Sequence, residues 1–270
     1  MPSLSTYLQR GLTTALNAAG HAGAYQMRHF GKAQKISYKG KINIVTEIDK
    51  QSEQMILKTL RSNFPDCDYV TEETDIAQSG KACRWIIDPL DGTTNYAHGY
   101  SCFCVSIALE VEGRVRLGVV YAPYYEELFY AVEGKGAWLK SKTGKKRLQV
   151  SKVTDLEKSL LVTGFPYSVR EESASLFALF ERMVLSAQGV RRDGSAALDL
   201  SYVAAGRFDG FWETNLRPWD TAAGQLMVRE AGGTNTDFAG HAYHPSMSAI
   251  VSTNGLIQKD MLAIIGFTPR

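Results

Sequence analysis

Residues 85–95 read WIIDPLDGTTN and carry two aspartates at the end of an apolar run. Three apolar residues lead into Asp88, a proline and a leucine separate it from Asp91, and Gly-Thr-Thr-Asn follows. The run indicates a buried strand, and a carboxylate at its end is costly unless something neutralises its charge. The stretch therefore predicts a strand that leads into a charged site.

The composition fits a globular protein with a large core. The chain has 270 residues, of which 44% are hydrophobic and 21% charged. A formal net charge of +2 is too close to neutral to indicate a nucleic-acid or membrane partner. Residues 1–23 lack the charged start and continuous apolar stretch of a signal peptide, and no stretch is apolar enough to span a bilayer. We expect a cytoplasmic protein that does not enter a membrane.

The four cysteines are Cys67, Cys83, Cys102 and Cys104. None forms a C-x-x-C pair, so the spacing does not indicate a thiolate zinc site. Cys102 and Cys104 fall on the same face of a predicted strand and lie too close together for ordinary bridging. We expect all four to be small buried side chains in a reducing compartment.

The rest of the chain divides into two patterns. A helical stripe predicts a first helix to about Phe30, residues 42–49 read as a short strand ending at Asp49, and residues 50–64 read as a helix. Residues 102–148 alternate with period two between glycine-bearing turns, which predicts an antiparallel meander. Strands and helices alternate afterwards. We expect two α/β lobes that share a core, over residues 1–150 and 151–270.

Carboxylates recur where predicted strands end or the next helix begins. Because strand ends converge in α/β folds, these groups should meet and repel one another unless cations lie among them. They offer only oxygen ligands, so the expected cation is hard, and Mg²⁺ fits best. The set comprises Asp49, Glu72, Glu73, Asp88, Asp91 and Asp220.

The residues after Asp91 suggest a second ligand. Gly92 lets a backbone approach a ligand closely, and Thr93 and Thr94 are placed to begin a short helix whose N–H groups favour a phosphate. Carboxylates for metal next to such a helix start predict a metal-assisted phosphoryl site. One ion would activate a water and another would stabilise the leaving oxygen.

Simpler interpretations exist for each element of this site. Asp-Pro-x-Asp-Gly is also a turn sequence, Glu72 and Glu73 can be a solvated strand end, and Asp49 and Asp220 can be helix caps. Pattern alone therefore predicts a Mg²⁺ phosphate site without naming a substrate.

Several motifs resemble the inositol monophosphatase family in its bacterial branch. They are NIVTEID (43–49), TEE (71–73), WIIDPLDGTTNY (85–96), RRDGSAALDLSYVAAGRFDGFWE (191–213) and PWDTAAG (218–224). The resemblance implies an α/β fold layered as an αβαβα sandwich of the inositol monophosphatase and fructose-1,6-bisphosphatase type. It also implies a homodimer, two or three Mg²⁺ ions and inhibition by lithium.

The resemblance also assigns roles to residues. The implied metal ligands are Glu72, Asp88, the Leu90 carbonyl, Asp91 and Asp220. Asp49 and Thr93 should form a hydrogen-bonded pair that orients and helps deprotonate the attacking water, with Glu72 also part of the catalytic set. The backbone N–H groups of Gly92 and Thr93 should hold the phosphate.

Substrate contacts follow from the same resemblance. Glu213, Asp91 and Ala196 should contact the substrate alcohol, Lys39 should lie near a third metal, and Glu73 should lie next to the ligands rather than among them. Thr71 stands where the family generally has glycine, which should alter the turn without removing a ligand. The family's DGTT form, seen at residues 91–94, favours inositol 1-phosphate or another small sugar phosphate. Fructose 1,6-bisphosphate and adenosine 3′,5′-bisphosphate are the alternatives.

A function of another class is a regulatory protein that binds RNA or a transcription complex. The basic stretch LKSKTGKKR (139–147) motivates it weakly. Because no aromatic residue interleaves with these charges, a solvated hairpin is the favoured interpretation. His98, His241 and His244 have no metal-ligand spacing and are expected in loops.

Overall fold

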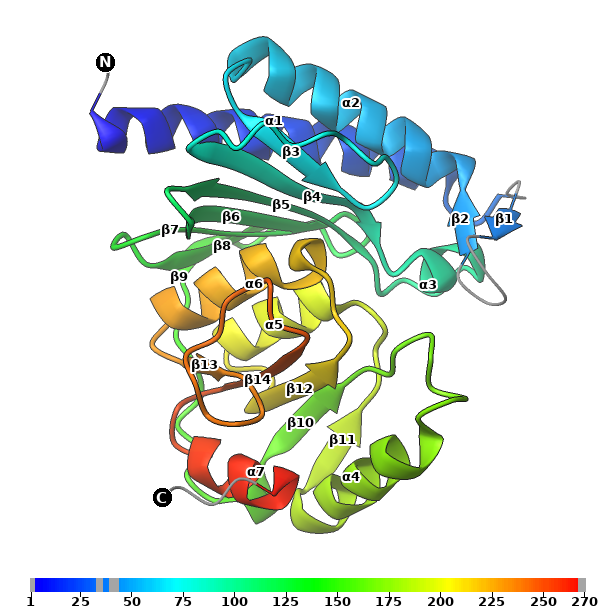
Figure 1. Cartoon of the computed structure of the whole chain (residues 1–270), viewed down its shortest axis with the longest axis vertical. Coiled ribbons are helices and arrows are strands. Elements are labelled where there is room, and N and C mark those ends of the chain that lie inside the picture. Colours follow the sequence, from blue (N-terminus) through cyan, green and yellow to red (C-terminus); the bar gives the residue numbers. More distant parts are fainter. Residues whose placement is uncertain (1–2, 33–35, 39–43, 267–270) are drawn as a thin grey trace.

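The computed structural model describes residues 3–32, 36–38 and 44–266, and it stacks helices and sheets in five layers (Figure 1). Helices α1 and α2 cover one face of a seven-stranded sheet, and α5 and α6 fill the space between this sheet and a five-stranded one. Helices α4 and α7 lie beyond the second sheet. The predicted αβαβα sandwich is confirmed.

The first sheet is a meander with one added edge strand. Its order is β3-β4-β5-β6-β7-β8-β9, with β3 parallel to β4 and every other pair antiparallel. The strands are β3 (Asp68–Thr71), β4 (Cys83–Asp91), β5 (Cys104–Val111), β6 (Arg114–Ala122), β7 (Glu127–Val132), β8 (Ala137–Ser141) and β9 (Gly144–Arg147). The meander expected over residues 102–148 is therefore present.

The outer helices bury a stripe of small and aliphatic side chains on this sheet. Helix α1 (Leu4–His29) begins at Ser3, whose Oγ accepts a hydrogen bond from the Thr6 N–H at 3.2 Å. Its buried stripe includes Leu8, Ala15 and Ala22. Helix α2 (Glu47–Asn63) packs beside it. None of the described helices is both long and apolar enough to cross a membrane.

Helix α6 in the middle layer packs closely against the first sheet on one side and against α5 on the other. A Cβ on Gly118 of β6 would lie 2.8 Å from the Cα of Ala223, and one on Gly224 would lie 2.5 Å from the Cβ of Leu200. Glycine at these two positions therefore lets α6 (Pro218–Glu230) pack tightly on the first sheet and on α5 (Ala196–Ala204). This packing carries the start of α6 to the end of β4.

The second sheet is mixed. Its order is β11-β10-β12-β14-β13, with β10 parallel to β11 and β12 and the remaining pairs antiparallel. Its strands are β10 (Leu160–Thr163), β11 (Gly189–Arg191), β12 (Gly210–Thr214), β13 (Thr234–Thr236) and β14 (Ala249–Thr253). The remaining elements are β1 (Ile36–Tyr38), β2 (Ile44–Thr46), α3 (Thr93–Ala97), a 3-10 turn (Leu156–Lys158), α4 (Ser173–Ser186) and α7 (Gln258–Ile265).

One predicted boundary is wrong near Asp49. Strand β2 ends at Thr46, and Asp49 lies in the first turn of α2 rather than at a strand end. The cause is a capping box: Asp49 accepts a hydrogen bond from the Thr46 N–H at 2.8 Å, and the Thr46 hydroxyl accepts one from the Ile48 N–H at 3.1 Å. The capping role that the sequence allowed for Asp49 is thus present.

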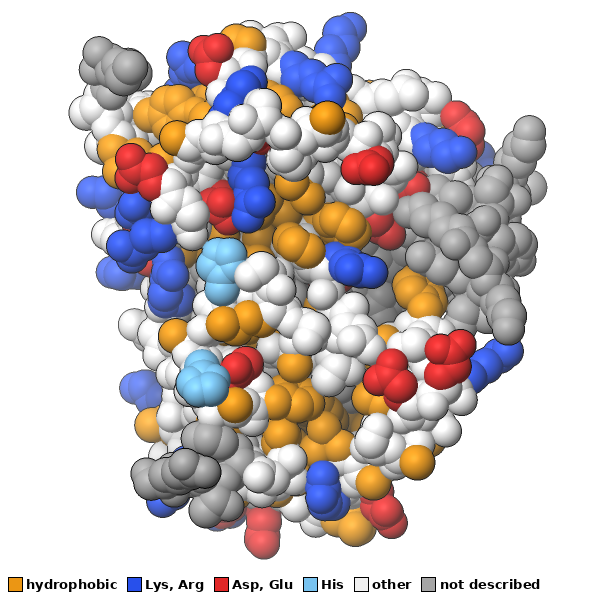
Figure 2. Space-filling model, viewed as in Figure 1, with side chains coloured by type: hydrophobic (Ala, Val, Ile, Leu, Met, Phe, Trp, Pro, Cys, Tyr) orange, Lys and Arg blue, Asp and Glu red, His pale blue; other side chains and the backbone are white. Residues whose placement is uncertain are grey.

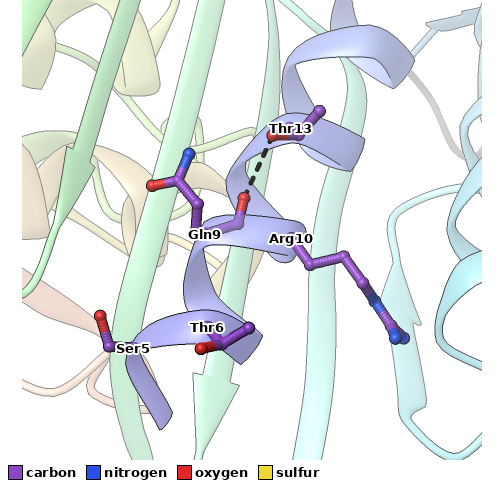
Figure 3. Close-up of a pocket in the computed structure, with 5 residues that line it drawn as sticks. All are labelled: Ser5, Thr6, Gln9, Arg10 and Thr13. Atoms are coloured by element: carbon purple, nitrogen blue, oxygen red, sulfur yellow. Dashed lines mark hydrogen bonds between the residues drawn. The ribbon is translucent and has the colours of Figure 1, made fainter. Parts of the chain in front are cut away.

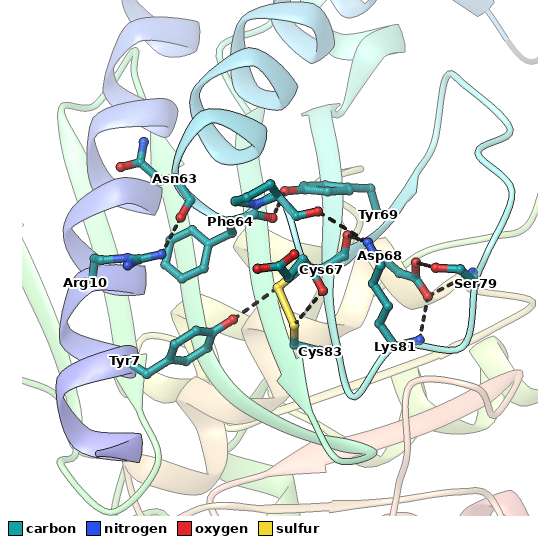
Figure 4. Close-up of a disulfide and its surroundings, with 12 residues drawn as sticks. Tyr7, Arg10, Asn63, Phe64, Cys67, Asp68, Tyr69, Ser79, Lys81 and Cys83 are labelled. Atoms are coloured by element: carbon teal, nitrogen blue, oxygen red, sulfur yellow. Dashed lines mark hydrogen bonds between the residues drawn. A yellow bond between two sulfur atoms is a disulfide. The ribbon is translucent and has the colours of Figure 1, made fainter. Parts of the chain in front are cut away.

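The expectation of four reduced cysteines is also wrong. Cys67 and Cys83 form a disulfide (Figure 4). Cys102 and Cys104 are free, buried thiols. Cys67 immediately precedes β3 and Cys83 begins β4, and Asp68 lies opposite Arg84 in this parallel pair. Strand pairing therefore brings the two Cα atoms to 5.0 Å, a juxtaposition that sequence spacing does not reveal.

Reduction of this bridge should lower the free energy of unfolding by about 3 kcal/mol, because the bridge closes a loop in the unfolded chain. The bridged cysteines are 16 residues apart. Urea unfolding with and without a phosphine reductant measures the difference. A Cys67→Ser, Cys83→Ser variant is the control, since its stability should not respond to the reductant. Equal stability of the oxidised and reduced parent would contradict the prediction.

Candidate active site

Asp88 and Asp91 lie at the carboxyl end of β4, where its pairing with β5 becomes irregular. Asp88 is opposite Ser106, the register then shifts, and Asp91 is opposite Cys104. The Asp88 Oδ1 accepts a hydrogen bond from the Leu90 N–H at 3.0 Å. The irregularity thus places both carboxylates at the same strand end.

Asp91 joins the two halves of the chain. Its Oδ2 accepts hydrogen bonds from the Ser195 hydroxyl and from the Ala197 N–H, both at 2.8 Å. These donors lie at the start of α5, in the segment that the sequence analysis connected with substrate through Ala196. Ser195, the N-cap residue of α5, was missed by the sequence analysis.

Gly92 forms the turn from β4 into α3. Its φ of +94° lies in the left-handed region, and a Cβ there would lie 2.8 Å from the Cys102 carbonyl oxygen. Only glycine meets both conditions without strain. The short helix expected at Thr93 is present as α3, and Thr93 is buried beneath this turn.

Asp49 and Thr93 are in contact, as the resemblance implies. The Thr93 hydroxyl lies 2.7 Å from the Asp49 Oδ1, to which it donates, and 3.0 Å from the Leu90 carbonyl oxygen. Asp49 is fully buried, and its other oxygen accepts from the N–H and hydroxyl of Thr46. Burial raises the Asp49 pKa, while the hydrogen bonds from Thr46 and Thr93 limit the rise.

Glu72 and Glu73 follow β3, the strand parallel to β4. Thr71, in place of the usual glycine, closes the turn with its side chain: its hydroxyl donates to the Thr74 carbonyl at 2.9 Å. The Glu73 N–H donates to Glu53 on α2 at 3.0 Å. Strand β3 and this anchored turn thus bring Glu72 to the same edge as Asp88.

Asp220 reaches the site from the first turn of α6. Its Oδ2 accepts a hydrogen bond from the Arg217 N–H at 2.6 Å, so the capping role allowed by the sequence is present. Trp219 is half-buried beside it, and Trp212 is buried in the second sheet. The packing of α6 on β4 and β5 carries Asp220 across the middle layer.

These carboxylates share one electrostatic environment. Burial raises the Asp88 pKa well above its usual value, and the charges of Glu72, Asp91 and Asp220 raise it further. Burial is also the main reason why the Asp91 pKa rises to about 6 and the Asp220 pKa rises strongly. The groups acting most strongly on Asp88 include these three carboxylates and no cationic side chain. The four side chains predicted to bind metal therefore lie within one another's electrostatic field.

The donor set suits a hard divalent cation. It consists of carboxylates and the Leu90 carbonyl, which accepts a hydrogen bond from the Thr93 hydroxyl. No three Asp, Glu, His or Cys side chains in the described part of the chain stand close enough to enclose an ion. Glu72, Asp88, Asp91 and Asp220 would have to converge on binding, which becomes favourable once a cation cancels their repulsion.

Glu213 lies at the end of β12, only 9% exposed. A Cβ on Gly164 would come within 2.3 Å of its carboxylate oxygens, so Gly164 makes room for this side chain. Burial raises the Glu213 pKa to about 8, although the charge of Arg192 opposes the rise. Lys39, the remaining predicted site residue, lies outside the described residues.

Asp199 of α5 was missed by the sequence analysis. It is 1% exposed, and its Oδ1 has no hydrogen-bond partner among the described residues. Burial raises its pKa well above the usual value, and Asp193, Glu213 and Asp91 raise it further. The mostly apolar residues 194–206 predict a helix and gave no signal for a functional acid. A single acidic side chain in a helix normally faces solvent.

Other surface features do not join this site. A hollow on α1 is lined by Ser5, Thr6, Gln9, Arg10 and Thr13, which include no carboxylate (Figure 3). His98 is exposed, as expected for a loop residue, and His241 pairs with Asp237 at 3.0 Å.

Comparisons with known proteins agree with this arrangement. The inositol monophosphatase family profile matches residues 8–267. The "Nus factor SuhB" of Salmonella typhimurium is 42% identical over 255 residues, covering 93% of this chain and 94% of the relative. The "Inositol-1-monophosphatase" of Synechocystis is 42% identical over 265 residues, covering 97% and 91%.

Solved structures show the same fold. The extragenic suppressor protein suhB of Bartonella henselae superposes with a TM-score of 0.89 at 38% identity, covering 94% of this chain and 97% of that one. The inositol monophosphatase of Anabaena superposes with a TM-score of 0.87 at 39% identity, covering 97% and 98%. Two of these four relatives are named as SuhB proteins and two as inositol monophosphatases.

Proposed function

Because this chain belongs to the inositol monophosphatase family, we propose that it is a Mg²⁺-dependent phosphomonoesterase that hydrolyses inositol 1-phosphate or a similar small polyol phosphate. The observation that carries the proposal is that Glu72, Asp91 and Asp220 act electrostatically on the buried Asp88 at the strand end where Thr93 bonds both Leu90 and Asp49. A carboxylate cluster alone is a binding site, whereas a cluster beside a buried hydroxyl–carboxylate pair has the parts needed for hydrolysis.

The four carboxylates and the Leu90 carbonyl would hold two or three Mg²⁺ ions. When bound, the cations would lower the pKa of an attacking water and neutralise charge on the phosphate and the leaving oxygen. The Gly92 and Thr93 N–H groups would hold the phosphate oxygens. Since Gly92 is fixed by its left-handed turn, these donors need no rearrangement to receive the substrate.

The Asp49–Thr93 pair would move the proton. The Thr93 hydroxyl already donates to Asp49, so its oxygen can accept a proton from the water while its own proton passes to the carboxylate. The Asp49 carboxylate is held in this orientation, because Thr46 donates two hydrogen bonds to its second oxygen. The water oxygen then forms the new bond to phosphorus as the ester bond breaks, and no phosphorylated side chain is required.

Glu213, Asp91 and the start of α5 at Ala196 would bind the alcohol part of the substrate. The DGTT sequence and the enzymatic name of the Synechocystis relative favour inositol 1-phosphate. Fructose 1,6-bisphosphate and adenosine 3′,5′-bisphosphate are the alternative substrates. We also propose a homodimer, in keeping with the family.

Phosphate release from a panel of esters tests this proposal. The panel contains inositol 1-phosphate, fructose 1,6-bisphosphate and adenosine 3′,5′-bisphosphate, each with Mg²⁺ and with a chelator. We expect Mg²⁺-dependent release, fastest from inositol 1-phosphate and inhibited by millimolar lithium. Faster release from another ester would change the proposed substrate but leave the proposed reaction unchanged. No release from any ester would overturn the enzymatic proposal.

A regulatory role is the second candidate, favoured by the name Nus factor among the relatives and by the β8–β9 hairpin. The ammonium group of Lys145 lies 4.3 Å from the centre of the Trp138 ring and 5.4 Å from that of Tyr130. Strand pairing thus supplies the aromatic neighbours that the stretch 139–147 lacks on its own. Figure 2 shows Lys and Arg side chains gathered at the left edge, where Figure 1 places β7 to β9.

RNA binding by the parent, and its loss in Lys145→Glu, would support this second role. Lys259→Glu, a charge reversal on α7, is the matched control. The two functions are compatible, so ester hydrolysis and RNA binding are measured on the same variants.

A further inference from the structure

The segment at residues 164–172, between β10 and α4, brings an aromatic residue to the predicted substrate side of the site. Thr163 of β10 is paired with Trp212 of β12, so Gly164 follows directly beside Glu213. Figure 1 shows the segment projecting from the second sheet in the direction of α3. Tyr167 is three residues beyond the point where this segment touches Glu213.

Both flanks of Tyr167 are anchored. On one side, the Phe165 ring packs edge-on against Phe177 and Phe180, with ring centres 5.6 and 5.4 Å apart. On the other, the Asn215 side chain donates to Glu172 at 3.2 Å and to Ser168 at 3.4 Å. Asn215 lies just beyond β12, so the segment is held against the strand that carries Glu213.

The Tyr167 side chain itself is exposed between these two anchors. It is 55% exposed, and within the described residues its hydroxyl makes no hydrogen bond. Its pKa is raised to about 12, first by partial burial and then by the negative charges of Glu72, Asp91, Asp220 and Asp88. A single exposed aromatic residue is ordinary, but this one lies on a segment held against the end of β12 and within the field of all four predicted ligands.

We infer that Tyr167 is a specificity residue that packs its ring on the C–H face of a cyclic polyol phosphate while Glu213 accepts hydrogen bonds from the hydroxyls. A cyclic polyol has an apolar face and a polar edge, and an aromatic ring next to a carboxylate matches both. An acyclic polyol phosphate has no such face. The inference rests on the proposed phosphatase function and narrows its substrate class.

Two variants distinguish the contribution of the Tyr167 ring from that of its hydroxyl. Tyr167→Phe keeps the ring, and Tyr167→Ala removes it. Tyr124→Ala removes another exposed tyrosine, from the turn between β6 and β7, and serves as the control. For each protein, kcat and KM are measured with inositol 1-phosphate and with glycerol 1-phosphate, which has no ring.

Tyr167→Ala should lower kcat/KM for inositol 1-phosphate by about fivefold, mainly through KM, because a ring contact of this kind contributes that much binding. The value for glycerol 1-phosphate should change less than twofold, and Tyr167→Phe should behave like the parent. Equal losses on both esters, or a Tyr167→Phe loss as large as that of Tyr167→Ala, would overturn the inference. The second outcome would point to the hydroxyl as a phosphate donor.

Failure of the phosphatase proposal can be told apart from failure of this inference. If the parent releases no phosphate, the same two esters are titrated into each protein by calorimetry with Mg²⁺ present. A selective loss of inositol 1-phosphate binding in Tyr167→Ala would then uphold the inference without the enzyme. No selective loss would overturn both.

Discussion

Replacement of Asp88 by asparagine is expected to lower kcat/KM for the phosphate ester by about 100- to 4,000-fold while making the metal-free protein more stable. Removing one partner of a buried charge interaction costs about 3–5 kcal/mol, and each 1.4 kcal/mol is about tenfold in rate. Without metal, however, Asp88 is a fully buried carboxylate facing three others. An amide of the same shape relieves that repulsion.

Opposite changes in activity and stability distinguish this prediction from simple unfolding. Phosphate release with Mg²⁺ gives the rate, and the unfolding temperature in chelator gives the stability. Asp209→Asn is a matched control, because Asp209 is also buried and accepts a backbone hydrogen bond, from the Leu160 N–H at 2.7 Å, but lies outside the site. Substantial Mg²⁺-dependent turnover by folded Asp88→Asn would rule out the metal assignment.

The features that could be predicted best from the sequence are those determined by adjacent residues. The apolar run into Asp88, the glycine turn at Gly92 and the helix start at Thr93 are all properties of adjacent residues, and the structure contains all three. The meander is also local, since each strand pairs with its neighbour in sequence. The family resemblance added the pairing of Asp49 with Thr93, which are 44 residues apart.

What could not be predicted depends on long-range packing. The Cys67–Cys83 bridge follows from parallel pairing of β3 and β4, and the cation–π contact of Lys145 follows from pairing across β7 to β9. Strands β11 and β13 have three residues each, too few to show a period. The roles assigned to the site residues stay predictions, because they concern bound metal and substrate.

The free energy of unfolding of the metal-free protein is expected to fall as pH rises from about 5 to 9. Burial raises the Glu213 pKa to about 8 and the Asp91 pKa to about 6, so the folded state holds protons that the unfolded chain has released. Their contribution is complete below the unfolded-state pKa values near 4 and is lost as pH passes the folded-state values. At about 1.4 kcal/mol per pKa unit, Glu213 alone accounts for up to roughly 5 kcal/mol.

Urea unfolding in chelator at pH 5, 7 and 9 measures this slope. Glu213→Gln should flatten it between pH 5 and 9, whereas Glu181→Gln, on the exposed face of α4, should leave it unchanged. Mg²⁺ should reverse part of the loss at high pH, because a bound cation favours the ionised form of Asp91 and its neighbours but does not act on Glu213 directly. A stability that rises with pH in chelator would mean that these carboxylates are already neutralised within the protein, and the case for a cation at the end of β4 would fail with it.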